Sequence, residues 1–282
     1  MKTAEHAKSG SYTVVLVGAG AVRGAWDPIV DAVRTVYKQV ASADQAHTAL
    51  ANLVSTLRYW HYAQSRELDI EGTVRPSTKD TFIQYYNTLE AICSAIADAL
   101  TRAEASQEYV LRDEFEAVWN LAIRSSATVK FVTTTWDRLI ARRVCRQWPE
   151  PEDAVFHLHG DRRDATTLLL PMEAAFEPYR RPSVRGALQT RHAALRQVLL
   201  AAERLVIYGT SLSSDDAELI RAIAAGLDES PVRQVDIVDP RHDRAARRLM
   251  TLLQKCRPSL SGRTPDQLAP PTSYLWRPSL VG

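Results

Sequence analysis

Cysteine is scarce in this chain, and its scarcity argues against two common scaffolds. Only three cysteines occur in 282 residues, at Cys93, Cys145 and Cys256. They are far apart and odd in number, and no Cys-x-x-Cys pair is present. Neither a disulfide framework nor a zinc ribbon is therefore indicated.

Long apolar runs and an excess of one charge are also missing. No run approaches the roughly 18 apolar residues that a membrane span requires, and the N-terminal segment lacks the apolar stretch of a secretion signal. The 35 basic and 33 acidic residues leave a net charge of +2, which gives no argument for a membrane or nucleic-acid partner. We expect a cytoplasmic protein that makes no membrane contact and no direct contact with nucleic acid.

What the sequence does contain is a β-branched apolar run that ends in glycines. Thr13–Val17 predicts a buried strand, Gly18-Ala19-Gly20 a tight turn, and Gly24 the approach to a helix. Glycines at such a turn let the backbone approach a phosphate at a helix N-terminus. The last glycine comes one position later than in the usual dinucleotide fingerprint, so a plain strand-to-helix turn accounts for this segment equally well.

The rest of the chain divides into a helical stretch and a strand–helix alternation. Residues 41–126 show only helical spacing of apolar residues, with a break at Gly72–Pro76. Further strands are predicted at Thr128–Thr134, Ala154–His159, Leu205–Tyr208 and Val235–Val238. Helices are predicted at Asp27–Val40, Trp136–Arg146, Ala187–Arg204, Asp215–Ala225 and Arg241–Leu253.

This alternation predicts an α/β fold, a Rossmann-like parallel sheet with a large all-helical insertion. We expect residues 11–40 and 127–256 to form the Rossmann-like sheet domain, and residues 41–126 to form the insertion. Residues 257–282 include five prolines, and we expect them to form a C-terminal tail that wraps the surface or docks on a partner.

Glycine, hydroxyl, carboxylate and imidazole groups follow each predicted strand. Ligands bind beyond the carboxyl ends of the strands in such sheets, so these groups are candidates for one shared site. The segments are Gly18–Gly20, Thr134–Asp137, His159–Gly160, Gly209–Leu212 and Asp239–Pro240.

In this order the segments resemble the successive NAD-binding motifs of sirtuin-like proteins. The motifs are Gly18-Ala19-Gly20, Thr-Thr-x-x-Asp at Thr133–Asp137, Leu158-His159-Gly160 and Gly209-Thr210-Ser211-Leu212. The similarity is closest to the bacterial sirtuin-like NAD hydrolases of anti-phage defence, and it covers the chain outside the helical stretch. No one motif is specific, whereas four in the correct order are.

The resemblance implies that NAD is bound as a substrate and cleaved at the nicotinamide–ribose bond. His159 matches the family's catalytic histidine and would take a proton from a ribose hydroxyl or a water. The resemblance implies that the remaining candidates bind NAD. Gly18, Ala19 and Gly20 would face the pyrophosphate, Gly209, Thr210 and Ser211 would hold the adenine-side ribose and phosphates, and Asp239 would reach an adenosine ribose hydroxyl. Gly24 and Asp137 are further candidates for NAD binding.

Two rival hypotheses for His159 remain open at this point. The first is a structural histidine with its hydrogen bonds satisfied. The second is a metal ligand, because His157 and His159 share one face of a predicted strand and would supply half of a metal site. No third ligand with suitable spacing is visible, so we expect no metal.

The chain departs from the family pattern at Thr135, where the family usually has an asparagine that positions water or nicotinamide. A threonine hydroxyl still donates and accepts one hydrogen bond, so we treat Thr135 as a candidate catalytic residue. The alternative hypothesis is that Thr135 caps the predicted helix at Trp136–Arg146. The family's zinc-bearing small domain is also absent, and the helical stretch in its place argues against peptide deacylation.

We therefore expect a regulated NAD hydrolase of anti-phage defence that releases nicotinamide and ADP-ribose, since unrestricted NAD cleavage would poison the host. Two rivals remain open: a module that binds NAD or ADP-ribose without cleaving it, which Thr135 would favour, and an ADP-ribosyltransferase. The resemblance further implies a homo-oligomer that works with a partner ATPase of the HerA type or with a sensor protein.

Overall fold

The centre of the molecule is a six-stranded sheet in which all neighbouring strands are parallel. The computed structural model describes residues 12–71, 76–124, 128–148 and 155–268. The strand order is β3-β2-β1-β4-β5-β6, which is that of a Rossmann fold and confirms the predicted architecture. The strands are β1 (Tyr12–Val17), β2 (Val129–Thr133), β3 (Val155–His157), β4 (Ala202–Tyr208), β5 (Gln234–Val238) and β6 (Ser259–Arg263).

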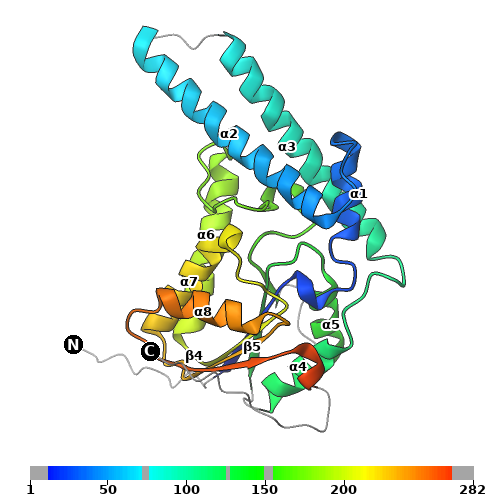
Figure 1. Cartoon of the computed structure of the whole chain (residues 1–282), viewed down its shortest axis with the longest axis vertical. Helices are drawn as coiled ribbons and strands as arrows, with labels where there is room; N and C mark the ends of the chain where they lie inside the picture. The colour runs from blue at the N-terminus through cyan, green and yellow to red at the C-terminus, as the bar shows by residue number, and fades with distance from the viewer. Residues whose placement is uncertain (1–11, 72–75, 125–127, 149–154, 269–282) are drawn as a thin grey trace, which may run out of the picture.

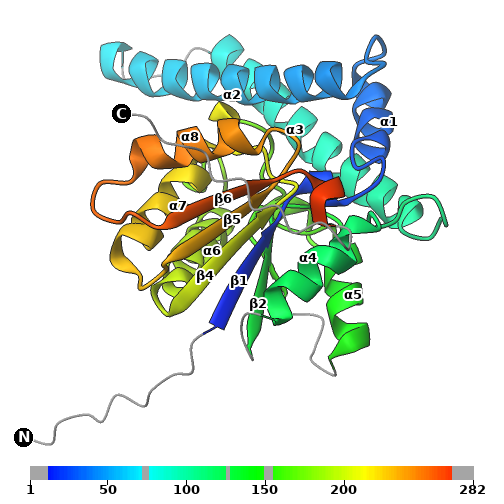
Figure 2. The ribbon, with the colours of Figure 1, turned by 60° about the horizontal axis from the view of Figure 1, so that its bottom comes forward.

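Helices cover both faces of this sheet, because alternate residues of each central strand point to opposite sides. Val14 and Leu16 of β1 pack under one set of helices, and Val15 and Val17 pack under the other. Figure 2 shows the two sets on either side of the strands. The first set is α6 (Pro182–Leu200), α7 (Ala217–Glu229) and α8 (His242–Leu252), and the second is α4 (Glu114–Ile123) and α5 (Leu139–Gln147).

The inserted helices are α1 (Asp27–Val36), α2 (Ala43–Glu71) and α3 (Pro76–Ala103). They share a hydrophobic cluster, which also includes Trp136, Leu168 and Leu170 from the loops beyond the strands. Figure 1 shows α2 and α3 side by side as a long hairpin that projects away from the sheet. The cluster includes Ile29 and Val33 of α1, so the helical unit begins earlier than the expected residue 41. Phe115 and Trp119 of α4 instead pack on the sheet, so the unit also ends earlier than residue 126.

Part of the expected C-terminal tail is a strand. Ser259–Arg263 pairs in parallel with β5 along its whole length, as the edge strand β6. Its sequence, Ser-Leu-Ser-Gly-Arg, has no apolar run and follows Pro258, so periodicity carried no strand signal. The edge of β5 recruits this segment through backbone hydrogen bonds, which need no particular side chains. Residues 269–282 lie outside the described part of the chain.

Both ends of the predicted Ala187–Arg204 helix differ in the structure. Helix α6 begins at Pro182, where a proline suits the first turn because it has no N–H to leave unpaired. Ala202–Arg204 belong to β4 and not to the preceding helix. Of the helices in the described residues, none is long and apolar enough to cross a membrane.

Candidate functional site

The strand order reverses direction at β1, whose two neighbours are β2 and β4. Consecutive connections leave the sheet on opposite sides of this point, which opens a crevice at the carboxyl ends of the strands. The Gly18–Gly20 segment follows β1, and Gly209 follows β4. The fold therefore brings the first and the last of the sequence motifs together.

The glycines of these two segments lie in direct backbone contact. The Gly18 N–H donates to the Tyr208 carbonyl at 2.8 Å, and the Gly20 N–H donates to the Gly209 carbonyl at 2.9 Å. A Cβ on Gly209 would come within 2.6 Å of the Ala21 nitrogen, and Gly209 has a φ of +62°. Close approach of the two loops is thus the reason for glycine here. The N–H groups of Gly18 and Gly20 already have partners within the protein.

A cavity of about 370 Å³ lies at this switch point, a size typical of small-molecule sites. One wall consists of strand-end residues that the sequence indicated, and all four motifs contribute to it. The lining predicted residues are Gly18, Ala19, Thr135, Asp137, His159, Gly209, Thr210 and Ser211.

The opposite wall of the cavity comes from the helical insertion and from loops that the sequence did not single out. Trp26 and Ile29 enter from the start of α1, His47 from α2, Leu100 from the end of α3, and Tyr109 from the segment before α4. The insertion therefore forms part of the site, rather than a separate appendage.

Three of the predicted binding residues do not line the cavity. Gly20 packs on Gly209 as described, and Gly24 forms a turn with φ +62° whose carbonyl accepts the Asp27 N–H at 2.9 Å. Asp239 accepts a hydrogen bond from the Arg241 N–H at 2.7 Å and so caps the turn before α8. In this position its carboxylate serves the local backbone.

Thr135 and Asp137 form a buried polar group at the end of β2. The Thr135 hydroxyl lies 3.0 Å from the Thr133 hydroxyl, and the Asp137 carboxylate accepts the Leu139 N–H at 3.0 Å and contacts the Tyr109 hydroxyl at 3.3 Å. Helix α5 begins at Leu139, and the backbone N–H of this first residue donates a hydrogen bond to the Asp137 carboxylate. The helix-cap hypothesis for Thr135 is therefore wrong, since Asp137 has that role.

Burial dominates the electrostatics of this group. Desolvation raises the pKa of Asp137 to about 6, against the lowering effect of its hydrogen bonds from the Leu139 backbone and from Tyr109. Loss of water, together with the nearby Asp137 charge, also raises the pKa of the Tyr109 phenol. The pKa of this carboxyl group therefore lies closer to neutral pH than that of an ordinary aspartate.

His159 lines the cavity just beyond the end of β3, next to His192 of α6. The two imidazole rings are nearly parallel, with an angle of 17° and 6.2 Å between their centroids. Withdrawal from water and, to a smaller extent, the neighbouring His192 lower the pKa of His159 to about 3. His159 is therefore uncharged at neutral pH and a weak base.

His157 and His159 lie in different surroundings. Its Nδ1 lies 3.3 Å from the Thr135 carbonyl oxygen, and the residue is buried outside the cavity. The strand ends at His157, so the two histidines do not share a face of β3. Within the described residues, no group of three or more His, Cys, Asp or Glu side chains has the arrangement of a metal site.

The charge of the cavity wall is predominantly acidic. Its carboxylates are Asp44, Asp137, Glu173, Asp215, Asp216 and Glu218, and its imidazoles are His47, His159 and His192. Among the described residues that line it, none is a lysine or an arginine. Such a wall favours a ligand with a cationic part, or one in which positive charge develops during reaction.

No protein-family model matches this chain, and a search of the curated proteins finds no relative. The chemistry of the site therefore follows from its own geometry.

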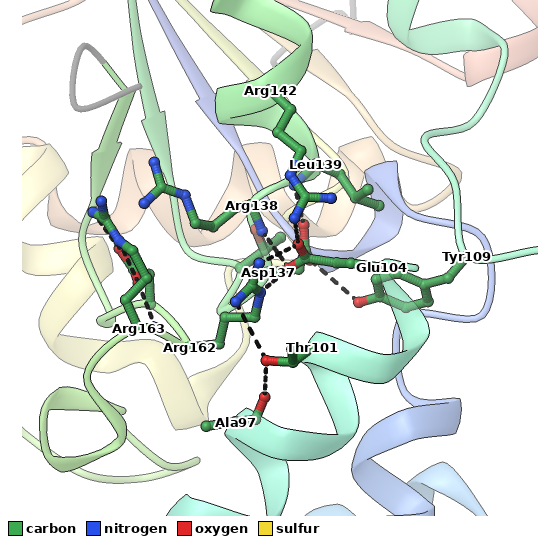
Figure 3. A network of polar contacts seen from close by, with 12 residues as sticks. Ala97, Thr101, Glu104, Tyr109, Asp137, Arg138, Leu139, Arg142, Arg162 and Arg163 are labelled. Carbon is green, nitrogen blue, oxygen red and sulfur yellow. Dashed lines mark hydrogen bonds and ion pairs between the residues drawn. The ribbon is translucent and has the colours of Figure 1, made fainter. Parts of the chain in front are cut away.

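A buried ionic network ties the helical insertion to the Thr135–Asp137 segment (Figure 3). Glu104, just beyond α3, accepts the Arg138 N–H at 2.9 Å and pairs with Arg162 and Arg142, each at 2.6 Å. Its side chain is only 1% exposed. Because Arg138 directly follows Asp137, this network fixes the segment that carries Asp137 against the end of α3.

Three residues in or beside the site, His192, Glu104 and Tyr109, had no recognisable signal in the sequence. His192 is a lone histidine in a helix, Glu104 a lone glutamate at a helix end, and Tyr109 lies in a segment predicted as helix. Glu218 lies a few residues beyond the Gly209-Thr210-Ser211-Leu212 motif, and it is not one of the predicted site residues.

Proposed function

We propose that this chain binds NAD in the switch-point cavity and hydrolyses its nicotinamide–ribose bond. The observation that carries the proposal is the convergence of four separate strand-end motifs, including His159 and Asp137, on one cavity of about 370 Å³. The sequence resemblance to sirtuin-like NAD hydrolases, which rests on the same motifs, names NAD as the ligand. A cytoplasmic location is part of the same proposal.

The acidic wall suits this chemistry. NAD carries a positive charge on its nicotinamide ring, and positive charge spreads over the ribose C1′ and ring oxygen as the bond breaks. Carboxylates held in place around this charge stabilise it without having to reorganise. The bond from C1′ to the nicotinamide nitrogen breaks with its electron pair on nicotinamide, water bonds to C1′, and one proton is released.

In this proposal each wall has its own task. Asp137, next to Thr135, faces the nicotinamide side, and His159 accepts a hydrogen bond from a ribose hydroxyl or from the attacking water. Thr210 and Ser211 hold the adenosine side of the ligand. Trp26 and Ile29 at the start of the insertion, together with Tyr109 from the segment before α4, close the opposite side, which excludes water and holds the substrate in position.

A second candidate function is a module that binds NAD or ADP-ribose without cleaving it. Two observations favour it: the Thr135 hydroxyl is engaged with the Thr133 hydroxyl at 3.0 Å, and the low pKa of His159, about 3, makes it a weak base.

The proposal of an NAD hydrolase also includes its activators. These are the expected homo-oligomer and a partner, which is an ATPase of the HerA type or a sensor protein.

The test is to incubate the purified full chain with NAD and to measure nicotinamide and ADP-ribose by chromatography. We expect the two products in equal amounts. Bound NAD that stays intact, with candidate activators present, would instead support the binding module. Transfer of labelled ADP-ribose to protein or nucleic acid would support the transferase.

A further inference from the structure

His192 occupies a position in α6 that an apolar residue would be expected to fill. The buried face of this helix consists of Leu188, His192, Leu195 and Leu199, which are spaced as one stripe. His192 is only 8% exposed, yet neither of its ring nitrogens has a hydrogen-bond partner among the described residues. Burying an imidazole without a hydrogen-bond partner costs free energy. Without a ligand, an apolar side chain at this position would therefore make the protein more stable. This cost indicates that a ligand uses the imidazole.

Glu218 fixes the surroundings of this imidazole from α7. Its Oε2 accepts the Ala175 N–H at 2.6 Å, and its Oε1 lies 3.6 Å from His192 Nδ1. That distance allows an electrostatic attraction but exceeds a hydrogen bond. The Glu218 carboxylate therefore favours an Nδ1–H tautomer, which leaves Nε2 of His192 as an acceptor.

His159 and His192 both line the cavity, with their rings nearly parallel at a centroid distance of 6.2 Å. Two parallel imidazoles on one wall offer two neighbouring nitrogen edges. Adjacent hydroxyl groups on one sugar ring can engage such a pair, because each hydroxyl both donates and accepts.

The charge state of the pair selects the chemistry of the ligand. Burial lowers the pKa values of both His159 and His192, and Glu218 opposes the effect only at His192. With Glu218 beside them, two uncharged imidazoles are poorly suited to a phosphate, which binds best to cationic donors. They are well suited to uncharged hydroxyls.

We propose that His159 and His192 together bind the two vicinal hydroxyls of the ligand's ribose, with Glu218 as the residue that positions His192. This inference rests on the proposed NAD site and adds a sugar subsite to it. The ribose concerned is the one on the nicotinamide side, since His159 lies at the strand end next to that of Thr135 and Asp137.

The test is calorimetric titration of the full chain with ADP-ribose, which carries this ribose, and with ADP, which lacks it. In His192→Leu, which matches the neighbouring stripe of leucines, ADP-ribose affinity should fall about tenfold, the effect of losing one good hydrogen bond. ADP affinity should stay within about twofold of wild type by the same reasoning. His192→Gln should recover part of the loss, since it restores a donor and an acceptor.

Gln189→Ala is the matched control, because Gln189 lies exposed on the same helix. Its two affinities should equal those of wild type. If His192→Leu does not fold, Glu218→Gln carries the test, since its amide oxygen can still accept the Ala175 N–H while the attraction to His192 is lost. It should weaken ADP-ribose and spare ADP.

Equal ADP-ribose affinity in wild type and the folded variants overturns the sugar subsite but leaves the NAD site intact. An equal loss for both ligands also overturns it, because that result means general damage to the cavity. If wild type binds neither ligand, the NAD site itself is wrong, and the two failures are thereby distinguished.

Discussion

The backbones of Gly20 and Gly209 are packed against each other: a Cβ built on Gly20 would lie 2.8 Å from the Gly209 Cα. The two residues are far apart in the sequence and follow neighbouring strands, β1 and β4. Their contact closes the turn after β1 onto the turn after β4, beside the cavity that Gly18, Ala19 and Gly209 line. Substitutions here thus act on the fold as well as on any ligand.

Gly209→Ala should reduce the free energy of unfolding by about 1–3 kcal/mol, because alanine is strained at positive φ. The positive φ of +62° is joined by a Cβ contact of 2.6 Å with the Ala21 nitrogen. Urea unfolding measures the effect. Gly186→Ala in α6 is the control: no atom lies within 4 Å of its Cβ, and it should stabilise the helix by about 0.5–1 kcal/mol. Equal effects at both glycines would disprove the close packing.

His159→Ala should lower the rate of nicotinamide release by about 10²–10⁴-fold while most of the NAD affinity remains. The reason is that His159 would orient a reacting hydroxyl or water rather than hold the whole ligand. His61→Ala, on α2 and outside the cavity, serves as the control in the same assay and should be unaffected. Unchanged turnover in His159→Ala removes this residue from the mechanism.

Thr135→Val should lower turnover more than it lowers NAD affinity, since it removes only the hydroxyl from a side chain that is 5% exposed. Thr135→Asn should raise turnover if the rest of the geometry is that of the sirtuin-like hydrolases. Nicotinamide release and a melting curve, measured on both variants, give the answer. A Thr135→Val variant with less stability but full turnover would show that the hydroxyl only supports Thr133.

Asp137→Asn should gain stability relative to wild type as the pH rises from acidic to neutral. The folded pKa of about 6 exceeds the ordinary 3.8, so between these values the folded protein holds a proton that the unfolded chain has released. The contribution of Asp137 to the unfolding free energy therefore falls as pH rises through this window.

Denaturant unfolding at pH 4 and pH 7 measures this dependence. From pH 4 to pH 7, the free energy of unfolding of Asp137→Asn should rise by up to about 3 kcal/mol relative to that of wild type. This value corresponds to the difference between the folded pKa of about 6 and the ordinary 3.8. Asp113→Asn is a control without burial, because that side chain is 96% exposed. A pH-independent difference for Asp137→Asn would contradict the buried, desolvated carboxylate.

Glu104→Ala should destabilise the protein by about 3–5 kcal/mol, because it leaves Arg142 and Arg162 without the buried carboxylate that pairs with them. It should also slow nicotinamide release, since the Arg138 N–H that Glu104 accepts adjoins Asp137. Glu116→Ala breaks a comparable 2.6 Å pair with Arg143, but that carboxylate is 50% exposed. The control should cost at most about 1 kcal/mol, and similar losses in both variants would contradict a special role for Glu104.

Local sequence was sufficient to predict the architecture and one wall of the cavity. Val14 to Val17 form an uninterrupted apolar run of β-branched residues and leucine, which is typical of a strand buried on both faces, and repeated strand–helix units are typical of a parallel sheet. Since all carboxyl ends of such a sheet lie at one edge, Gly18, Thr135, His159 and Gly209 were expected to converge, and they do.

Only the tertiary structure decided the edge strand β6 and the surroundings of His192 and Glu104. The pairing of β6 depends on a free strand edge and not on its own side chains, so Ser259–Arg263 had no pattern to find. Likewise, nothing in the spacing of α6 distinguishes His192 from the leucines of its stripe, and nothing near Glu104 indicates that three arginine residues meet it. Periodicity reports which face of an element is buried, but packing between distant elements determines which polar groups share that buried space.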